Sequence, residues 1–174
     1  MENTEEVLEK NDNIEIQYII STNKFIILSI LSFGYYIIWW HYKAWRFFNQ
    51  KDQLDIMPAV RATNGIFFIY SLLRRILKFA QEKGYPKKYP SLLYSLVFII
   101  LVLPSLPPLY FSLPTILLSI LLIQPFQALN FAKRQSTDLR VIEQTNFNRR
   151  QKVIIFIGAC CWISFIAEIL IYIN

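Results

Sequence analysis

Charged residues are scarce in this chain, and this scarcity excludes an ordinary soluble domain. They make up 17% of the 174 residues, whereas soluble domains carry about 25%. The apolar residues also form long blocks, because residues 92–132 contain no charged side chain and residues 153–173 contain only Glu168. Blocks of this length exceed what a buried soluble helix needs and match membrane-spanning helices. The sequence therefore predicts an all-α integral membrane protein.

Histidine and cysteine are also rare, which removes most of the residue types that build catalytic or metal sites. His41 is the single histidine and has no carboxylate pair near it in the sequence, so it makes neither a metal site nor a catalytic triad. Cys160 and Cys161 are adjacent, a spacing that predicts free thiols. No phosphate-binding loop, nucleophile elbow or metalloprotease motif occurs. We therefore expect no catalytic residue, no metal and no cofactor.

Four apolar segments predict membrane spans. An acidic segment covers residues 1–23, with partial strand-like alternation at 14–20, and residues 24–174 form a single membrane domain. Ser21, Thr22 and Asn23 offer N-cap side chains for its first helix. Prolines and a lack of charge between the second and third spans predict a helical hairpin, either fully spanning or shallow and re-entrant. The predicted spans are at about 25–42, 91–106, 111–130 and 153–173.

Basic residues are concentrated in two loops, which predicts the orientation of the chain. Residues 43–88 hold ten Lys and Arg and residues 133–152 hold six, whereas the hairpin turn and the C-terminus hold none. Because basic loops stay on the cytoplasmic side, we expect a multi-pass protein of the cell membrane with both loops cytoplasmic and both termini outside. The net charge of +6 then reflects these loops and anionic lipid, and we expect no binding of nucleic acid.

Residues 60–81 predict an amphipathic helix and not a further span, since their uncharged stretch is only twelve residues long. On a helical wheel, residues 66–81 place apolar side chains on one broad arc and basic or polar side chains opposite. This pattern is typical of an interfacial helix on an anionic leaflet. The alternative is that the apolar arc packs against the protein's own bundle. The predicted fold has four transmembrane helices and one cytoplasmic interfacial amphipathic helix.

The stretch 34–48 carries eight aromatic rings around His41. Trp and Tyr side chains settle at the level of the lipid headgroups, because their rings are apolar and their NH or OH groups need a partner. We interpret the stretch as the cytoplasmic end of the first span, with an interfacial, partly hydrated His41. The candidate lipid- or partner-binding residues are its aromatic and basic side chains and the cations that follow: Trp39, Trp40, Tyr42, Lys43, Arg46, Arg61, Arg74, Arg75 and Lys78.

Polar side chains within the predicted spans are candidates for a polar path through the membrane. Gln124, Gln127 and Asn130 are spaced three apart, and they either line such a path or hydrogen-bond a neighbouring helix. Glu168 is an ionisable group inside a span, which makes it a functional candidate by default. Its place near the C-terminus leaves a second interpretation, in which the carboxylate reaches water at the outer interface.

One pattern resembles a known family. The pattern is Gly-x-Tyr-x-x-x-Trp-x-Tyr-Lys followed by Pro-x-x-Arg, and it is carried by Gly34, Tyr36, Trp40, Tyr42, Lys43, Pro58 and Arg61. Over residues 31–75 the chain resembles a family of small bacterial multi-pass membrane proteins of unknown function, in which the signature ends the first transmembrane helix. The resemblance implies a membrane location and assigns no reaction.

Two hypotheses of function follow from these patterns. The first is a small non-enzymatic integral membrane protein that binds anionic lipid headgroups or partner proteins, including further copies of itself, through its basic cytoplasmic face. The alternative is a small oligomeric channel or transporter that uses the polar residues within the spans. A membrane enzyme acting on lipid is a third class, and it requires a cavity that holds His41 beside Asp52 or Asp55.

Overall fold

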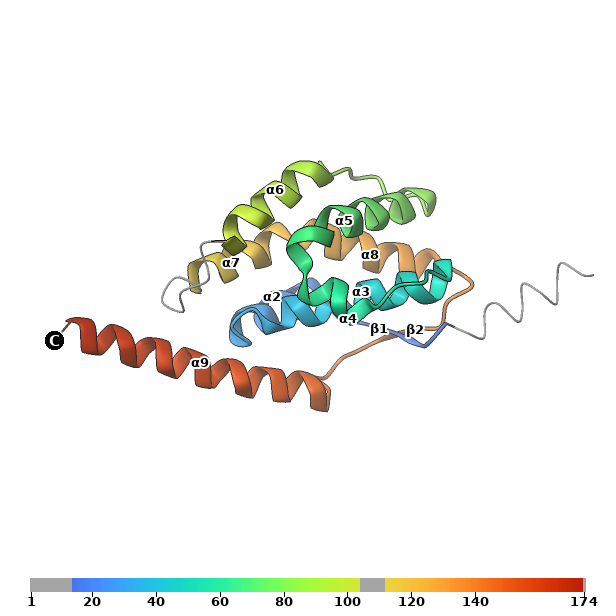
Figure 1. Cartoon of the computed structure of the whole chain (residues 1–174). Coiled ribbons are helices and arrows are strands. Elements are labelled where there is room, and N and C mark those ends of the chain that lie inside the picture. The colour runs from blue at the N-terminus through green and yellow to red at the C-terminus, as the bar shows by residue number, and fades with distance from the viewer. Residues whose placement is uncertain (1–13, 104–111, 174) are drawn as a thin grey trace, which may run out of the picture.

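The described part of the protein is mainly helical, as the sequence predicts (Figure 1). The computed structural model describes residues 14–103 and 112–173. Two short strands, β1 (Gln17–Ile19) and β2 (Val141–Glu143), accompany the helices. The helices are α2 (Thr22–Leu31), α3 (Tyr35–Asp52), α4 (Pro58–Thr63), α5 (Gly65–Glu82), α6 (Ser91–Val102), α7 (Ser112–Leu121), α8 (Ile123–Gln135) and α9 (Arg149–Ile173).

The predicted first span is not one helix but two. α2 begins with the Ser21 side chain accepting a hydrogen bond from the Lys24 backbone N–H, so the predicted N-cap is confirmed. The helix then stops because Phe33 (φ 53°) and Gly34 (φ 84°) adopt left-handed conformations, which interrupt α-helical hydrogen bonding. The chain reverses there, and the ring centroid of Phe25 lies 5.7 Å from that of Trp40. A continuous helix over 25–42 is therefore wrong.

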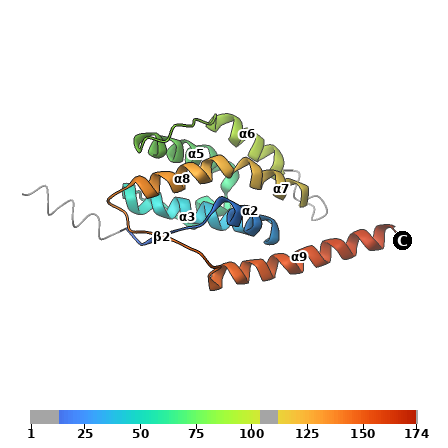
Figure 2. The same ribbon diagram turned by 180° about the vertical axis from the view of Figure 1, so that it is seen from behind.

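The reversal makes α2 and α3 a helical hairpin. α2 has ten residues, which is about 15 Å of helix and roughly half the thickness of a bilayer core. Its connecting turn lies against the middle of α9, where the ring centroids of Phe33 and Trp162 are 4.9 Å apart, and on the same side of the molecule as the start of α7 in both views (Figures 1 and 2). The α2–α3 hairpin is consequently too short to carry the chain across a membrane.

The predicted amphipathic helix at 60–81 forms as α4 and α5, and the apolar face of α5 is covered by the protein itself. α5 packs against α6 and α8. Tyr89 ties this packing together, because its hydroxyl donates a hydrogen bond of 2.8 Å to the Leu73 carbonyl. The prediction that the apolar face of α5 inserts into lipid is therefore wrong. The alternative, in which this face packs against the protein's own bundle, is confirmed. The buried side chains of α5 are Ile69, Leu72, Leu73, Ile76, Phe79 and Ala80.

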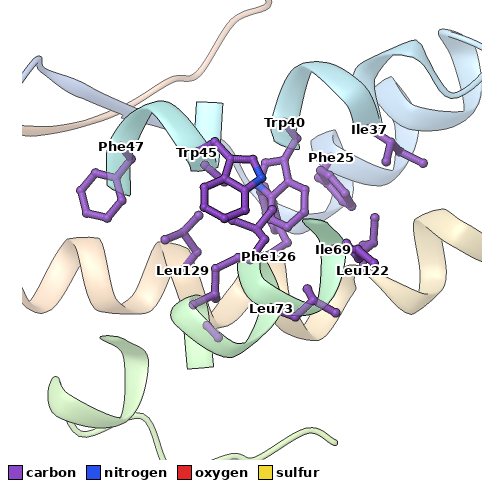
Figure 3. Close-up of a cluster of buried hydrophobic side chains, with 14 of the residues drawn as sticks. Phe25, Ile37, Trp40, Trp45, Phe47, Ile69, Leu73, Leu122, Phe126 and Leu129 are labelled. Atoms are coloured by element: carbon purple, nitrogen blue, oxygen red, sulfur yellow. The ribbon is translucent and has the colours of Figure 1, made fainter. Parts of the chain in front are cut away.

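The hydrophobic core lies where α3, α5 and α8 meet, and α2 closes it (Figure 3). Aromatic rings fill its centre. Phe25 of α2 stacks on Phe126 of α8, with ring centroids 4.3 Å apart, and the Trp45 side chain is fully buried beside them. Aromatic pairs of this kind add to the free energy gained by burying apolar area. The aromatic stretch of the sequence is thus mainly core and not a belt of exposed rings.

The next two predicted spans correspond to α6, α7 and α8. α6 and α7 pack against each other, which agrees with a hairpin, while the turn predicted near 105–112 falls largely outside the described residues. α6 has twelve residues, too few to cross a bilayer. α7 and α8 continue one another across Leu122, and the combined stretch Pro114–Gln135 is long and apolar enough to span, although more than half of it is buried within the protein.

α9 is the other helix of spanning length, and it confirms the predicted helix at 153–173. It is 25 residues long, equivalent to about 37 Å, and very little of it is buried. Among the described residues only these two stretches have the length and apolar composition of a membrane span. The structure therefore does not confirm four spans.

β1 and β2 pair in parallel, with Gln17 opposite Val141 and Ile19 opposite Glu143. This pairing joins the N-terminal segment to the basic loop 133–152. The Lys24 ammonium adds a hydrogen bond of 3.1 Å to the Gln144 carbonyl. The prediction that the N-terminal segment and this loop lie on opposite sides of a membrane is therefore wrong for residues 14–20, because paired strands cannot be separated by a bilayer.

Candidate anion-binding pocket

A cavity of about 350 Å³ lies between β1, α3, the end of α8 and the start of α9. We call it the basic pocket, because five cations and a single carboxylate, that of Glu15, are among the described residues that line it. Aromatic side chains form the remainder of the wall along α3, among them Tyr36, Trp39 and Trp40. The cations are Lys43 and Arg46 of α3, Lys133 of α8, and Arg149 and Arg150 of α9.

Lys133 is the most deeply placed of these cations. It stands in the last turn of α8, where a positive charge interacts favourably with the helix dipole. Only 7% of the residue is exposed, and its Nζ lies 4.5 Å from the centroid of the Phe47 ring, a cation–π contact. None of the ion pairs among the described residues involves Lys133. The buried Lys133 amine therefore lines the pocket without a carboxylate partner.

Lys43 and Arg150 approach the pocket from two different helices and share one aromatic ring. The Lys43 Nζ and the Arg150 Cζ each lie 5.9 Å from the centroid of Trp39. Burial lowers the pKa of Lys43, and the positive charges of Arg46 and Arg150 lower it further, while the Glu15 carboxylate raises it. Burial is thus the main cause of the lowered pKa of Lys43, and the neighbouring cations add to it.

Arg46 is the cation of the pocket that already has an anionic partner. Its guanidinium forms a salt bridge with the Glu15 carboxylate and donates a hydrogen bond of 3.2 Å to the Tyr42 hydroxyl. Both members of the salt bridge are partly exposed, so water screens the pair and its contribution to stability is small. Glu15 therefore neutralises one cation at the edge of the pocket and leaves the others available.

The first turn of α9 positions Arg149 and Arg150 through a reciprocal cap. The Asn148 side chain accepts a 2.9 Å hydrogen bond from the Gln151 backbone N–H, and the Gln151 side chain accepts one of 2.9 Å from the Asn148 backbone N–H. This capping box determines where α9 begins. The first turn holds no acidic residue, although carboxylates are favoured at that end of a helix. Two arginines there create a site that favours a bound anion.

Some predicted binding residues line the pocket and others do not. Trp39, Trp40, Lys43 and Arg46 line it, and Tyr42 contacts Arg46. The others lie on α4 and α5, away from it. The Arg61 guanidinium lies over the rings of Trp45 and Phe68, Arg75 pairs with Asp52 at 3.2 Å, and Arg74 and Lys78 are exposed.

The residues of the predicted polar path make hydrogen bonds within the bundle. The Gln124 side chain accepts a hydrogen bond of 2.9 Å from the Tyr94 hydroxyl, and the Gln127 amide donates one of 3.3 Å to Thr22. Asn130 is buried and donates one of 3.0 Å to the Ile20 carbonyl, at the end of β1. Glu168 is exposed on α9. The structure does not bring these four side chains together.

His41 is buried in the core, where only 2% of it is exposed. The prediction that His41 is interfacial and partly hydrated is therefore wrong. Its Nδ1 lies 2.8 Å from the Ile37 carbonyl oxygen, and its ring centroid is 5.4 Å from that of Phe98. Asp52 instead binds Lys51 and Arg75 at the other end of α3. A lipid-modifying enzyme would require a cavity that holds His41 beside Asp52 or Asp55, and none of these three residues lines the basic pocket. The described part of the chain contains no group of three metal-ligating side chains.

Reasoning from the sequence missed Lys133, Arg149 and Arg150 as site residues. The signal was present, because the loop 133–152 is rich in cations and residues 148–151 match the Asn-x-x-Gln form of a capping box. Their convergence with Lys43 depends on how α8 and α9 pack against α3.

Comparison with family models, with curated proteins and with solved structures finds no match to this chain. The resemblance over residues 31–75 therefore stays a prediction.

Proposed function

We propose that the protein is a non-enzymatic membrane protein that is anchored by α9 and binds anionic lipid through its basic cytoplasmic face. The observation that carries this proposal is the separation of exposed apolar side chains from cations along α9. Its first turn and the residue after it bear Arg149, Arg150 and Lys152. The remainder exposes apolar side chains to an extent that a water-soluble surface rarely shows, including Val153, Phe156, Ile157, Ile163, Ile166, Leu170 and Ile171.

The two hairpins support the same placement. Exposed apolar side chains such as Leu31 and Tyr35 mark the turn of the α2–α3 hairpin, and Ile100 and Ile120 mark α6 and α7. The α2–α3 turn, the C-terminal end of α6 and the start of α7 lie on the side of the molecule toward which α9 runs (Figures 1 and 2). Hairpins of this length would enter one leaflet of the bilayer and return to the same surface. β1 and both basic loops would then lie on that one side of the membrane. The excess of Lys and Arg in those loops favours the cytoplasm as that side.

The alternative of a channel or transporter draws less support from the structure. It requires Gln124, Gln127 and Asn130 to face a polar path, whereas they bond Tyr94, Thr22 and the Ile20 carbonyl within a single chain. Binding of a partner protein, or of a second copy, remains part of the proposal through the exposed Arg74 and Lys78 on α5.

The proposal is tested by identifying the lipids that co-purify with the full chain in a mild non-ionic detergent. We expect anionic phospholipid to be enriched over its share in the source membrane, and the enrichment to decline as the salt concentration rises, because salt screens exposed charges. Recovery of the chain from the soluble fraction, or a bound-lipid composition equal to that of the bulk membrane, would contradict it.

A further inference from the structure

We propose that the basic pocket binds one anionic phospholipid by its headgroup phosphate, held chiefly by Lys133, Lys43 and Arg150. This inference rests on the proposed function, since it requires the bilayer surface to reach the start of α9. The proposed function requires only that a charged face attracts anionic lipid. The present proposal adds a defined site that binds one lipid molecule per chain.

The unbalanced charge of the pocket is the first argument. Glu15 compensates Arg46, which leaves Lys43, Lys133 and the two arginines of α9 facing one cavity. Lys133 is more than nine-tenths buried, and burial, together with the positive charge of Lys43, lowers the pKa of Lys133 to about 7. An anion beside it would stabilise its protonated form. A phosphate in the cavity would neutralise several of these cations at once through charge-assisted hydrogen bonds.

The depth of the pocket is the second argument. Arg150 lines it, and the apolar run of α9 begins at Val153, three residues further along. At 1.5 Å per residue these two positions differ in height by about 4.5 Å. If the apolar part of α9 occupies the hydrocarbon core, the pocket lies at the level of the lipid phosphates. A lipid could then enter from the bilayer without leaving it.

The shape and walls of the pocket form the third argument. Its volume of about 350 Å³ accommodates a small polar group, being at the lower end of the usual range for ligand sites. The guanidinium of Arg150 can engage two phosphate oxygens, and the ammonium groups of Lys43 and Lys133 act as point charges beside it. Tyr36, Trp39 and Trp40 supply apolar ring surface of the kind that suits the glycerol and the first carbons of an acyl chain.

Native mass spectrometry of the full chain in a neutral detergent provides the test, with phosphatidylglycerol as the probe and phosphatidylcholine as the comparison lipid. We expect one phosphatidylglycerol per chain to bind more tightly than any further lipid. Lys133→Met, which retains an unbranched apolar side chain, should weaken that first binding step by about tenfold or more. Because Lys133 is buried, retention of the helical circular dichroism signal must accompany the loss.

Arg150→Gln provides a second variant that does not disturb the core, because Arg150 is exposed at the wall of the pocket, and it should weaken binding in the same direction. Lys87→Met is the matched control. It removes the same charge from an exposed position between α5 and α6 that does not line the pocket, and it should leave the first binding step unchanged. Glu15→Gln should strengthen binding up to about fivefold by freeing Arg46.

Equal loss in Lys87→Met and Lys133→Met would overturn the pocket while leaving attraction by the charged face intact. Absence of any preference for phosphatidylglycerol in the unmodified chain would overturn the proposed function as well. A competition experiment with inorganic phosphate completes the test. If it displaces phosphatidylglycerol at low millimolar concentration and loses affinity in Lys133→Met, the site belongs to a free phosphoryl compound and the assignment to lipid is overturned.

Discussion

The Trp162 indole donates a hydrogen bond of 2.8 Å from Nε1 to the Ile30 carbonyl oxygen. This bond joins the middle of α9 to the last turn of α2. The same indole contacts Phe33 edge-on, with ring centroids 4.9 Å apart. α9 is otherwise largely exposed, so its position depends on a small number of contacts with the α2–α3 hairpin.

The first prediction concerns this hydrogen bond. Trp162→Phe retains an aromatic ring against Phe33 and removes the donor, which should lower the free energy of unfolding by about 1 kcal/mol. Unfolding in detergent micelles, followed by circular dichroism, measures the change. Ile163→Val, at an exposed position on the same helix, is the control. An unchanged stability in Trp162→Phe would mean that α9 does not dock on α2 in this way.

The second prediction concerns the close approach of α9 to the same turn. A Cβ atom on Gly158 would lie 2.3 Å from the Ser32 Cα and 2.5 Å from the Leu31 carbonyl oxygen. Because both are backbone atoms, Gly158→Ala should push α9 away and destabilise the fold by about 1–3 kcal/mol. The shift can be measured as an increased distance between spin labels on α9 and α2.

Ala159 provides the control for this substitution. It is exposed, and Ala159→Ser adds a similar volume on the next residue without a clash. Gly158→Ala with unaltered spin–spin distances would show that the helices do not approach this closely.

The third prediction concerns the turn between α2 and α3. Gly34 has a φ of 84°, a conformation that costs a residue with a Cβ about 1 kcal/mol or more. Gly34→Ala should therefore lower the stability by that amount. Gly65→Ala is the control, because the nearest atom to its added Cβ would be in ordinary contact at 3.9 Å. Equal stability of the two variants would indicate that 25–42 forms one continuous helix after all.

The fourth prediction concerns the pairing of β1 with β2. In a background with Cys160→Ser and Cys161→Ser, Tyr18→Cys and Ile142→Cys should form a disulfide on oxidation, because the two residues are register partners. Adjacent strands lie about 4.8 Å apart, within reach of a disulfide. Gel mobility under non-reducing conditions detects the bond, and Tyr18→Cys combined with Lys88→Cys is the negative control.

The same variants test on which side of the membrane these segments lie. A membrane-impermeant maleimide should label Tyr18→Cys and Ile142→Cys singly from the same side. Labelling of the two positions from opposite sides would restore the original expectation of an external N-terminal segment.

Several features of the fold were predictable from short stretches of sequence. The apolar length of residues 153–173 predicted α9, and Ser21 predicted the start of α2. The partial alternation at 14–20 coincides with β1. Each of these signals depends on interactions within a few residues, so no knowledge of the rest of the chain is needed.

The α2–α3 turn and the packing partner of the apolar face of α5 were not predictable in the same way. Residues 25–42 are apolar enough to read as one span, and a single glycine at 34 does not reveal a reversal of the chain. The periodicity of residues 66–81 shows that one face is buried, but lipid and protein bury such a face equally well. Packing against α6 and α8 decides the matter in favour of protein.

The helical class, the apolar length of α9 and the abundance of cations in the loops follow from the order of the residues alone, because these properties are local or additive. The tertiary structure alone decided that α2 turns back, that β1 joins the basic loop, and that Lys43, Lys133 and Arg150 face one cavity. The physical reason is that Lys133 and Arg150 are distant from Lys43 along the chain. Only the packing of α3, α8 and α9 places their charges close enough together to act on a single anion.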